Sequence, residues 1–202
     1  MKLHYAKGTV ACAVAIALQE AGIEHTLVRV DFAAGEQTKA PFHALNPKGR
    51  VPLIETDKGV LTETGAILEY IGTLAPGMIP EDPFAAAQMR EVMYYLASTV
   101  HVNHAHRYRG SRWADRPESF EDMQAKVPET MAASAAYLES HALAGDFVAG
   151  KDVSIADGYL YIISLWIEAD GVALADYPKL AAFRDRMETR PSVAAVRDAG
   201  VL

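Results

Sequence analysis

A segment with two prolines in the first third of the chain carries residues suited to binding a peptide. It reads Asn46-Pro47-Lys48-Gly49-Arg50-Val51-Pro52-Leu53. A proline at the start of a strand cannot donate to the hydrogen-bond ladder, so Val51 and Pro52 are expected at an edge or an opening. If the bond before Pro52 is cis, the N–H and C=O of Val51 point into a crevice, where an extended peptide can pair with them as an added strand. The alternative is an ordinary proline between a loop and a strand.

A second group follows where a strand is expected to pass into a helix, in Leu61-Thr62-Glu63-Thr64-Gly65-Ala66-Ile67. Glu63 or Thr64 falls at the N-cap position. The free N–H groups and the positive dipole end of such a helix attract a carboxylate. The Thr64 hydroxyl can donate a further hydrogen bond, and Glu63 can meet an ammonium group. The alternative is that Thr64 only caps the helix.

The first turn of the chain brings a phenol, a hydroxyl and a thiol near one helix start, from Tyr5, Thr9 and Cys12. A helix N-terminus stabilises an anion, including a thiolate. Thr9 is expected to be the N-cap, a role that explains it by itself. Cys12 lies off the expected apolar face of the helix, and a small buried apolar residue is the alternative to a reactive thiol.

Aromatic and basic residues crowd the end of a long helical stretch: His101, His104, His106, Arg107, Tyr108, Arg109 and Trp113. His101 and His104 share a helix face, but with no partner cysteine and no obvious nearby carboxylate we predict no metal site. Aromatic surface suits apolar molecules, so His104, Tyr108 and Trp113 are expected to form walls of a pocket. The alternative is a solvated polar helix face.

The elements that must position these groups alternate between strand and helix in the first part of the chain. The periodicity predicts strands at 2–5 and 25–31, an amphipathic helix at 10–21, a short helix at 40–45, a hairpin at 51–62 and a helix around 67–74. A strand–helix–strand unit requires parallel strands with a right-handed crossover, and the hairpin adds an antiparallel pair. This part is therefore an α/β domain.

The composition changes at Pro76–Pro83, where three prolines in eight residues predict a stiff linker. Every later signal is helical, with helices expected at 84–109, 118–142, 154–168, 178–189 and 191–199. Ser154 and Asp157 fit a capping box at the start of a buried helix. We expect an α/β domain at 1–78, a linker at 79–86 and an all-helical domain at 87–202.

Composition and charge exclude several classes of protein. The 202 residues include 19 Lys and Arg against 26 Asp and Glu, and the net charge of −7 argues against a nucleic-acid binder. No run of 18 apolar residues predicts a membrane span, and the first residues lack the layout of a signal peptide. Cys12 is the only cysteine, which excludes an internal disulfide and a site with several thiolates. A cytoplasmic location is expected.

Three motifs together resemble the glutathione S-transferase family, most closely its bacterial beta-type members. They are MKLHYAKG at the start, LNPKGRVPL followed by LTETGAILEYI, and VSIADGYLY in the helical part. The resemblance covers essentially the whole chain. It implies a thioredoxin-like N-terminal domain that binds glutathione, an all-helical C-terminal domain that contributes the electrophile pocket, a cis-proline at Pro52 and a homodimer.

The resemblance also implies roles for the glutathione-binding residues. Val51, beside Pro52, would hold the cysteinyl backbone of glutathione, and Glu63 and Thr64 would hold its γ-glutamyl end. The group that meets the glycyl carboxylate has no clear match; the candidates are Lys39, Lys48 and Arg50.

The expected catalytic residues are Thr9, Tyr5 and His101. Beta-type members usually carry a cysteine where this chain has Val10, which is expected to line the glutathione site. Thr9 stands where serine-type members keep their activating hydroxyl, and Tyr5 is the second candidate. His101 matches a histidine that beta-type members bring to the cleft.

The function implied is that of a glutathione transferase acting in detoxification. A free thiol has a pKa near 8.5, and a hydroxyl donor together with a helix dipole favours the thiolate. Thr9 is expected to donate to the glutathione sulfur, which then attacks an apolar electrophile. One alternative is a non-catalytic ligand carrier or partner-binding regulator. The other is glutathione-dependent reduction, dehalogenation or isomerisation.

Overall fold

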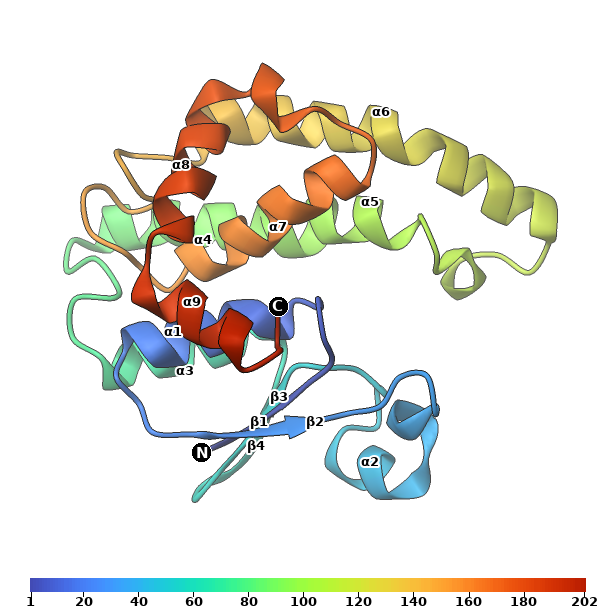
Figure 1. Ribbon diagram of the computed structural model, residues 1–202, viewed down its shortest axis with the longest axis horizontal. Coiled ribbons are helices and arrows are strands. Elements are labelled where there is room, and N and C mark those ends of the chain that lie inside the picture. The colour runs from blue at the N-terminus through green and yellow to red at the C-terminus, as the bar shows by residue number, and fades with distance from the viewer.

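The strands and helices of the first half follow the order expected from the sequence. The computed structural model describes residues 1–202. The elements are β1 (Lys2–Tyr5), α1 (Ala11–Glu20), β2 (Thr26–Arg29), α2 (Ala40–Leu45), β3 (Leu53–Thr56), β4 (Gly59–Thr62) and α3 (Thr64–Leu74). Helices α1 and α3 lie between the sheet and the helical half of the molecule (Figure 1).

The four strands form one mixed sheet in the order β2-β1-β3-β4. Strand β1 runs parallel to β2, with α1 as the crossover, and antiparallel to β3, which forms a hairpin with β4. Leu3 in β1 pairs with Leu27 on one side and with Ile54 on the other. The expected parallel unit and hairpin are confirmed, and the segment before β3 lies where strand pairing stops.

Helix α1 is present as predicted but is buried on every side. The prediction that it is amphipathic, with one exposed polar face, is therefore wrong. All residues from Ala11 to Leu18 are buried, because β1 packs on one side of the helix and the helical half covers the other. Cys12 lies within this apolar environment, where burial raises the pKa of its thiol to about 12. Its Sγ donates to the carbonyl of Val201 at 3.1 Å, and the N–H of Gly8 donates to the same oxygen at 2.9 Å. The C-terminal segment therefore fixes the turn before α1.

The second half is helical. Its elements are α4 (Pro83–Tyr95), a π-helical turn (Leu96–Val100), α5 (His101–Ala105), α6 (Pro117–His141), α7 (Asp157–Ala169), α8 (Pro178–Glu188) and α9 (Pro191–Asp198). A core of 46 buried residues runs through both halves. No helix combines the length and the apolar character needed to cross a bilayer.

Helix α4 begins inside the segment expected to be the linker. Asp82 accepts hydrogen bonds from the N–H groups of Phe84 and Ala85 at 3.1 and 2.8 Å, and Pro83 occupies the first helical position, where its missing N–H costs nothing. The non-helical connection thus runs from Ala75 to Asp82. Residues 83–86 belong to the helix.

The long helix expected at 84–109 is interrupted and ends early. A π-helical turn spans Leu96–Val100, and the N–H of His101 bonds to the carbonyl of Leu96, five residues back. Helix α5 then ends at Ala105. The extra residue in a π turn changes which later side chains share a helix face, and such turns are frequent at functional sites. The positions of His101 and His104 depend on this turn.

The start of α7 is held by the predicted Ser154–Asp157 pair, in a modified form. The carboxylate of Asp157 accepts from the Ser154 N–H at 2.7 Å and from the Ser154 hydroxyl at 2.6 Å. The hydroxyl thus bonds to the carboxylate instead of accepting from the Asp157 N–H. Gly158 follows, and a Cβ there would lie 2.8 Å from the carbonyl oxygen of Ala13. Glycine at this position lets α7 approach α1 closely, which joins the two halves.

Candidate active site

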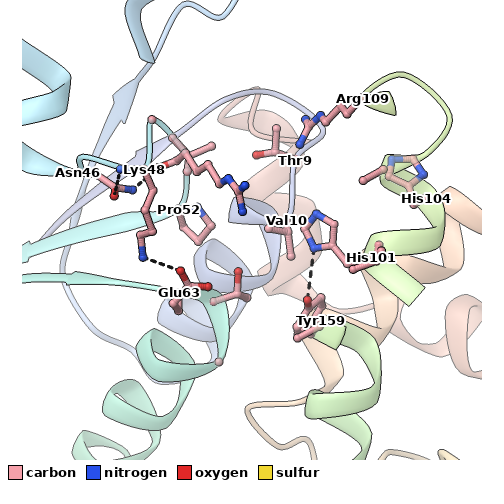
Figure 2. A pocket seen from close by; sticks show the side chains of 18 of the residues that line it. Thr9, Val10, Asn46, Lys48, Pro52, Glu63, His101, His104, Arg109 and Tyr159 are labelled. Carbon is pink, nitrogen blue, oxygen red and sulfur yellow. Dashed lines mark hydrogen bonds and ion pairs between the residues drawn. The ribbon is translucent and has the colours of Figure 1, made fainter. Parts of the chain in front are cut away.

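A cavity of about 550 Å³ lies between the two halves of the molecule. Its first wall comes from the turn before α1, the loop that leads to β3, and the start of α3. Its second wall comes from α4, α5, α7 and residues 109–113. Figure 2 shows side chains from both walls facing this space.

The segment before β3 presents free main-chain groups to the cavity. The Val51–Pro52 bond is cis, and both residues line the cavity. No hydrogen bond within the chain uses the N–H or the C=O of Val51. The buried side chain of Asn46 holds the preceding turn, because its Nδ2 donates to the Arg50 carbonyl at 2.7 Å and its Oδ1 accepts from the Lys48 N–H at 3.2 Å. An extended peptide can pair with Val51 here.

The start of α3 forms the neighbouring part of this wall. Glu63 is the N-cap residue of α3, but its side chain makes no capping hydrogen bond. Thr64 is the first residue inside the helix, so the alternative prediction that Thr64 caps it is wrong. Glu63 has φ of 72°, a region that costs a residue with a side chain about 1–3 kcal/mol. Its carboxylate, with the side chain 70% exposed, accepts from Lys48 Nζ at 2.5 Å. A carboxylate for an ammonium group thus stands beside free helix N–H groups.

The turn before α1 places Thr9 and Val10 in the cavity but not Tyr5. The N-cap of α1 is Val10, one residue later than expected. The Thr9 hydroxyl donates to the Ala6 carbonyl at 2.7 Å and accepts from the Ala11 N–H at 3.4 Å. Tyr5 is buried in β1 and does not line the cavity, because side chains alternate between the faces of a strand.

His101 lies at the centre of the second wall. Its Nδ1 is 3.4 Å from the Tyr159 hydroxyl, and its ring meets the edge of Trp166 at a centroid distance of 5.0 Å. Burial, and the nearby charges of His104 and Arg109, lower the pKa of His101 to about 4. The imidazole is therefore neutral at pH 7, and can serve as a hydrogen-bond donor or acceptor without charge.

His104 is held by a buried carboxylate that sequence reasoning missed. Its Nδ1 lies 2.7 Å from Asp170 Oδ2, and its ring stacks on Trp166 at 4.1 Å and 10°. Asp170, whose side chain is fully buried, also pairs with Arg107 at 3.1 Å. The expectation of no nearby carboxylate is wrong, since Asp170 follows α7, 66 residues away in the sequence. His104 and Trp113 line the cavity, whereas Tyr108 is 74% exposed and lies outside it.

Three arginines line the cavity: Arg50, Arg109 and Arg112. Sequence reasoning named Arg50 as a glutathione-site residue but gave no role to the other two, or to Tyr159 and Trp166. Residues 109–112 follow the end of α5, and only the early end of that helix turns them back over the cavity. No local sequence signal indicates this reversal.

Comparisons with known proteins agree with this arrangement. The family model for the glutathione S-transferase N-terminal domain matches residues 1–73, and that for the glutathione S-transferase C-terminal domain matches residues 105–198. Glutathione S-transferase GstA of Escherichia coli O157:H7 is 30% identical over 198 residues, which cover 96% of this chain and 95% of that protein. Other curated relatives are named maleylacetoacetate isomerase.

Solved structures match over the whole chain. A glutathione transferase homologue from Sulfitobacter, solved with bound glutathione, is 54% identical with a TM-score of 0.97, covering 100% of this chain and 98% of that one. The bacterial beta class enzyme of Sphingomonas chungbukensis is 29% identical with a TM-score of 0.85, covering 100% of both chains. The expected fold and the likeness to beta-type members are confirmed.

Proposed function

The chain belongs to the glutathione S-transferase family of enzymes, and from that premise we propose that it binds glutathione in this cavity and activates its thiol for attack on an electrophile. The observation that carries the proposal is the unpaired N–H and C=O of Val51 beside the cavity. These two groups pair with the cysteinyl residue of glutathione as a further strand would.

The two ends of glutathione follow from this placement. The γ-glutamyl carboxylate meets the free N–H groups at the start of α3 with the Thr64 hydroxyl, and the ammonium group meets Glu63. Binding of the ammonium group breaks the exposed ion pair between Lys48 and Glu63. The loss of stability is small because exposed ion pairs contribute less than about 1 kcal/mol. Arg50, adjacent to Val51, is the cation nearest in sequence for the glycyl carboxylate, and lines the cavity. Lys48 also lines the cavity and is the other candidate, whereas Lys39 lies outside it.

The sulfur then lies at the start of α1. Thr9 is the proposed activating residue, although its proton now bonds to the Ala6 carbonyl. A neutral hydrogen bond contributes about 1 kcal/mol, whereas one to a charged acceptor contributes about 1.5–3 kcal/mol. Rotation of the Thr9 hydroxyl, so that it donates to a thiolate instead of to the Ala6 carbonyl, is therefore favourable. The positive end of α1 and the unpaired N–H of Val10 support the same anion.

Replacing Thr9 by Val tests this mechanism. The thiol pKa of bound glutathione, measured by thiolate absorbance after binding is established by calorimetry, should rise by about one unit, the equivalent of about 1.4 kcal/mol. Thr73→Val is a matched control, because the exposed Thr73 hydroxyl also bonds to a carbonyl three residues back, at 2.7 Å. An unchanged thiol pKa in Thr9→Val would remove Thr9 from the mechanism.

A second candidate function is a ligand carrier or regulator that binds glutathione without turnover. It is favoured by Val10, which replaces the usual cysteine, and by the bond that holds the Thr9 proton at Ala6. Tight glutathione binding with an undepressed thiol pKa and no turnover of 1-chloro-2,4-dinitrobenzene would support this candidate over the transferase.

We further propose that the 1–78 region holds glutathione, that the 87–202 region supplies the electrophile pocket, and that the protein works as a cytoplasmic homodimer in detoxification. Exposed apolar side chains near the junction between α3 and α4 support a dimer, since Leu74 is 45% and Phe84 is 72% exposed. Sedimentation analysis measures the oligomeric state, and a monomer at micromolar concentration would refute the homodimer.

A further inference from the structure

The three arginines of the cavity differ from most other arginines of the protein in lacking a carboxylate partner. Six others form ion pairs: Arg90, Arg107, Arg184, Arg186, Arg190 and Arg197. No side-chain hydrogen bond or ion pair involves Arg50, Arg109 or Arg112. This cationic group lies in a protein whose net charge is −7, so the field in the cavity has the opposite sign to that of the whole molecule.

The carboxylates of the cavity cannot neutralise these arginines, because both are already paired. Glu63 bonds to Lys48, and Glu69 forms a two-point pair with Arg90 at 2.6 and 3.0 Å. The guanidinium groups also raise one another's energy. Arg112 stays exposed on its solvent side, but partial desolvation at the cavity and the charges of Arg109 and Arg50 lower its pKa to about 10. Burial together with the charge of Arg50 lowers the pKa of Arg109. Binding of an anion between them relieves this repulsion.

The carboxylates of glutathione can neutralise only part of the positive charge of these three arginines. Its γ-glutamyl carboxylate is placed at α3, and its glycyl carboxylate needs one cation, for which Arg50 lies in the same loop as Val51. Arg109 and Arg112 belong to the opposite wall, in the segment that also supplies Trp113. Figure 2 shows Arg109 extending from the helical half toward the cavity.

We propose that Arg109 and Arg112 bind a carboxylate of the second substrate, so that the preferred electrophile is a carboxylic acid with an apolar aromatic or unsaturated body. The planar guanidinium fork matches a carboxylate with two parallel hydrogen bonds. The rings of Trp113 and Trp166 contact the apolar body. This inference rests on the proposed function and narrows its substrate class.

A matched pair of electrophiles tests the inference: 4-chloro-3-nitrobenzoate and 4-chloro-3-nitrobenzamide, which have the same shape and differ in charge. In both, the thiolate sulfur forms a bond to the chlorine-bearing ring carbon, and chloride leaves with the electron pair of the C–Cl bond. Each kcat/KM is divided by the uncatalysed rate constant of the same compound. We expect this ratio to favour the benzoate by about 10- to 100-fold, the contribution of hydrogen bonds to a charged group.

In the double variant Arg109→Gln/Arg112→Gln, the benzoate-to-benzamide ratio of normalised kcat/KM should fall to about threefold or less. The double variant Arg109→Lys/Arg112→Lys should keep part of the preference for the benzoate. Arg116→Gln is the control, because Arg116 is exposed, has no ion pair and lies outside the cavity. Circular dichroism checks that each variant is folded. The glutathione Kd of the double Gln variant should stay within about threefold of the original; a tenfold rise would show instead that these arginines bind the glycyl carboxylate.

Failure of this inference is distinguishable from failure of the proposed function. Glutathione binding and turnover of the neutral 1-chloro-2,4-dinitrobenzene test the function alone, and a benzoate ratio near one in a protein that passes both overturns only the carboxylate site. If the protein shows no turnover, the affinities for 4-nitrobenzoate and 4-nitrobenzamide, measured by calorimetry, test the carboxylate site instead. Preference for the benzoate that disappears in the double Gln variant supports the site, and equal affinity refutes it.

Discussion

The two walls of the cavity are built from different kinds of chemical group. The wall from the α/β half offers free main-chain groups, the N–H and C=O of Val51 and the N–H groups at the starts of α1 and α3, together with a few polar side chains such as that of Glu63. The wall from the helical half offers side chains: histidines, arginines and tryptophans. Main-chain groups suit an invariant ligand such as a peptide, whereas side chains can be exchanged without changing the fold. The contrast indicates that glutathione binding and electrophile choice are separable properties.

The largest effect that tests this separation is expected from Asp170→Ala. The change leaves His104 and Arg107 without their buried partner and should lower the free energy of unfolding by about 3 kcal/mol, measured by urea denaturation. KM for 1-chloro-2,4-dinitrobenzene should rise because His104 and the stacked Trp166 lose their support, while the glutathione Kd stays the same. Asp185→Ala removes an exposed carboxylate of α8 and serves as the control. An equal rise in the glutathione Kd would contradict separable walls.

An intermediate effect is expected from the titration of His101. Its pKa is about 4 in the folded protein against 6.5 for an ordinary histidine. An unfolded chain therefore binds a proton that the folded protein does not, and stability falls as the pH drops from 6.5 toward 4. The loss is about 2 kcal/mol, below the limit set by the two pKa values because His101 is half-buried and water screens its charge.

Comparing the original protein with His101→Asn isolates this contribution, since other groups titrate in both. The difference in unfolding free energy between the two proteins should shrink between pH 7 and pH 4.5. Parallel curves for the original protein and His101→Asn would mean that the side-chain wall does not resist protonation.

The smallest effect is expected at the main-chain wall, from Glu63→Gly. Glycine accepts the φ of 72° without strain, so stability should rise by about 1 kcal/mol, while the glutathione Kd should increase about tenfold because the ammonium group loses its partner. Glu63→Gln keeps the strained backbone and should weaken binding without stabilising the fold. Unfolding curves and calorimetry measure both quantities. A stability gain in Glu63→Gln as large as in Glu63→Gly would contradict stored backbone strain.

The main-chain wall could be anticipated from the sequence because its signals are local. The prolines around Val51 and the helix start at Glu63 each indicate a backbone conformation from a few residues. The sheet order followed from the alternation of elements. The position of Thr9 relative to the start of α1 was one residue off, because the hydroxyl bonds backward to Ala6.

The side-chain wall could not be anticipated in the same way because long-range packing places it. The π turn at Leu96–Val100 shifts the faces that carry His101 and His104. Asp170 meets His104 only through the packing of α7 against α5, and Arg109 enters the cavity because α5 ends at Ala105. The burial of α1 could not be anticipated either, since the alanines at every second position from Ala11 to Ala17 carry no signal that the helix is covered all round.

The carbonyl of Val201, which accepts from Gly8 and Cys12, has a consequence for how the protein acquires its activity during translation. The turn proposed to hold the sulfur is synthesised long before its anchor, because Cys12 and Val201 are 189 residues apart in the sequence. A nascent chain can pair its strands early, but the sulfur site is completed only after Val201 has been synthesised. Changes to the segment around Val201 are therefore expected to act on a part of the chain that is distant in sequence, the turn proposed to hold the glutathione sulfur.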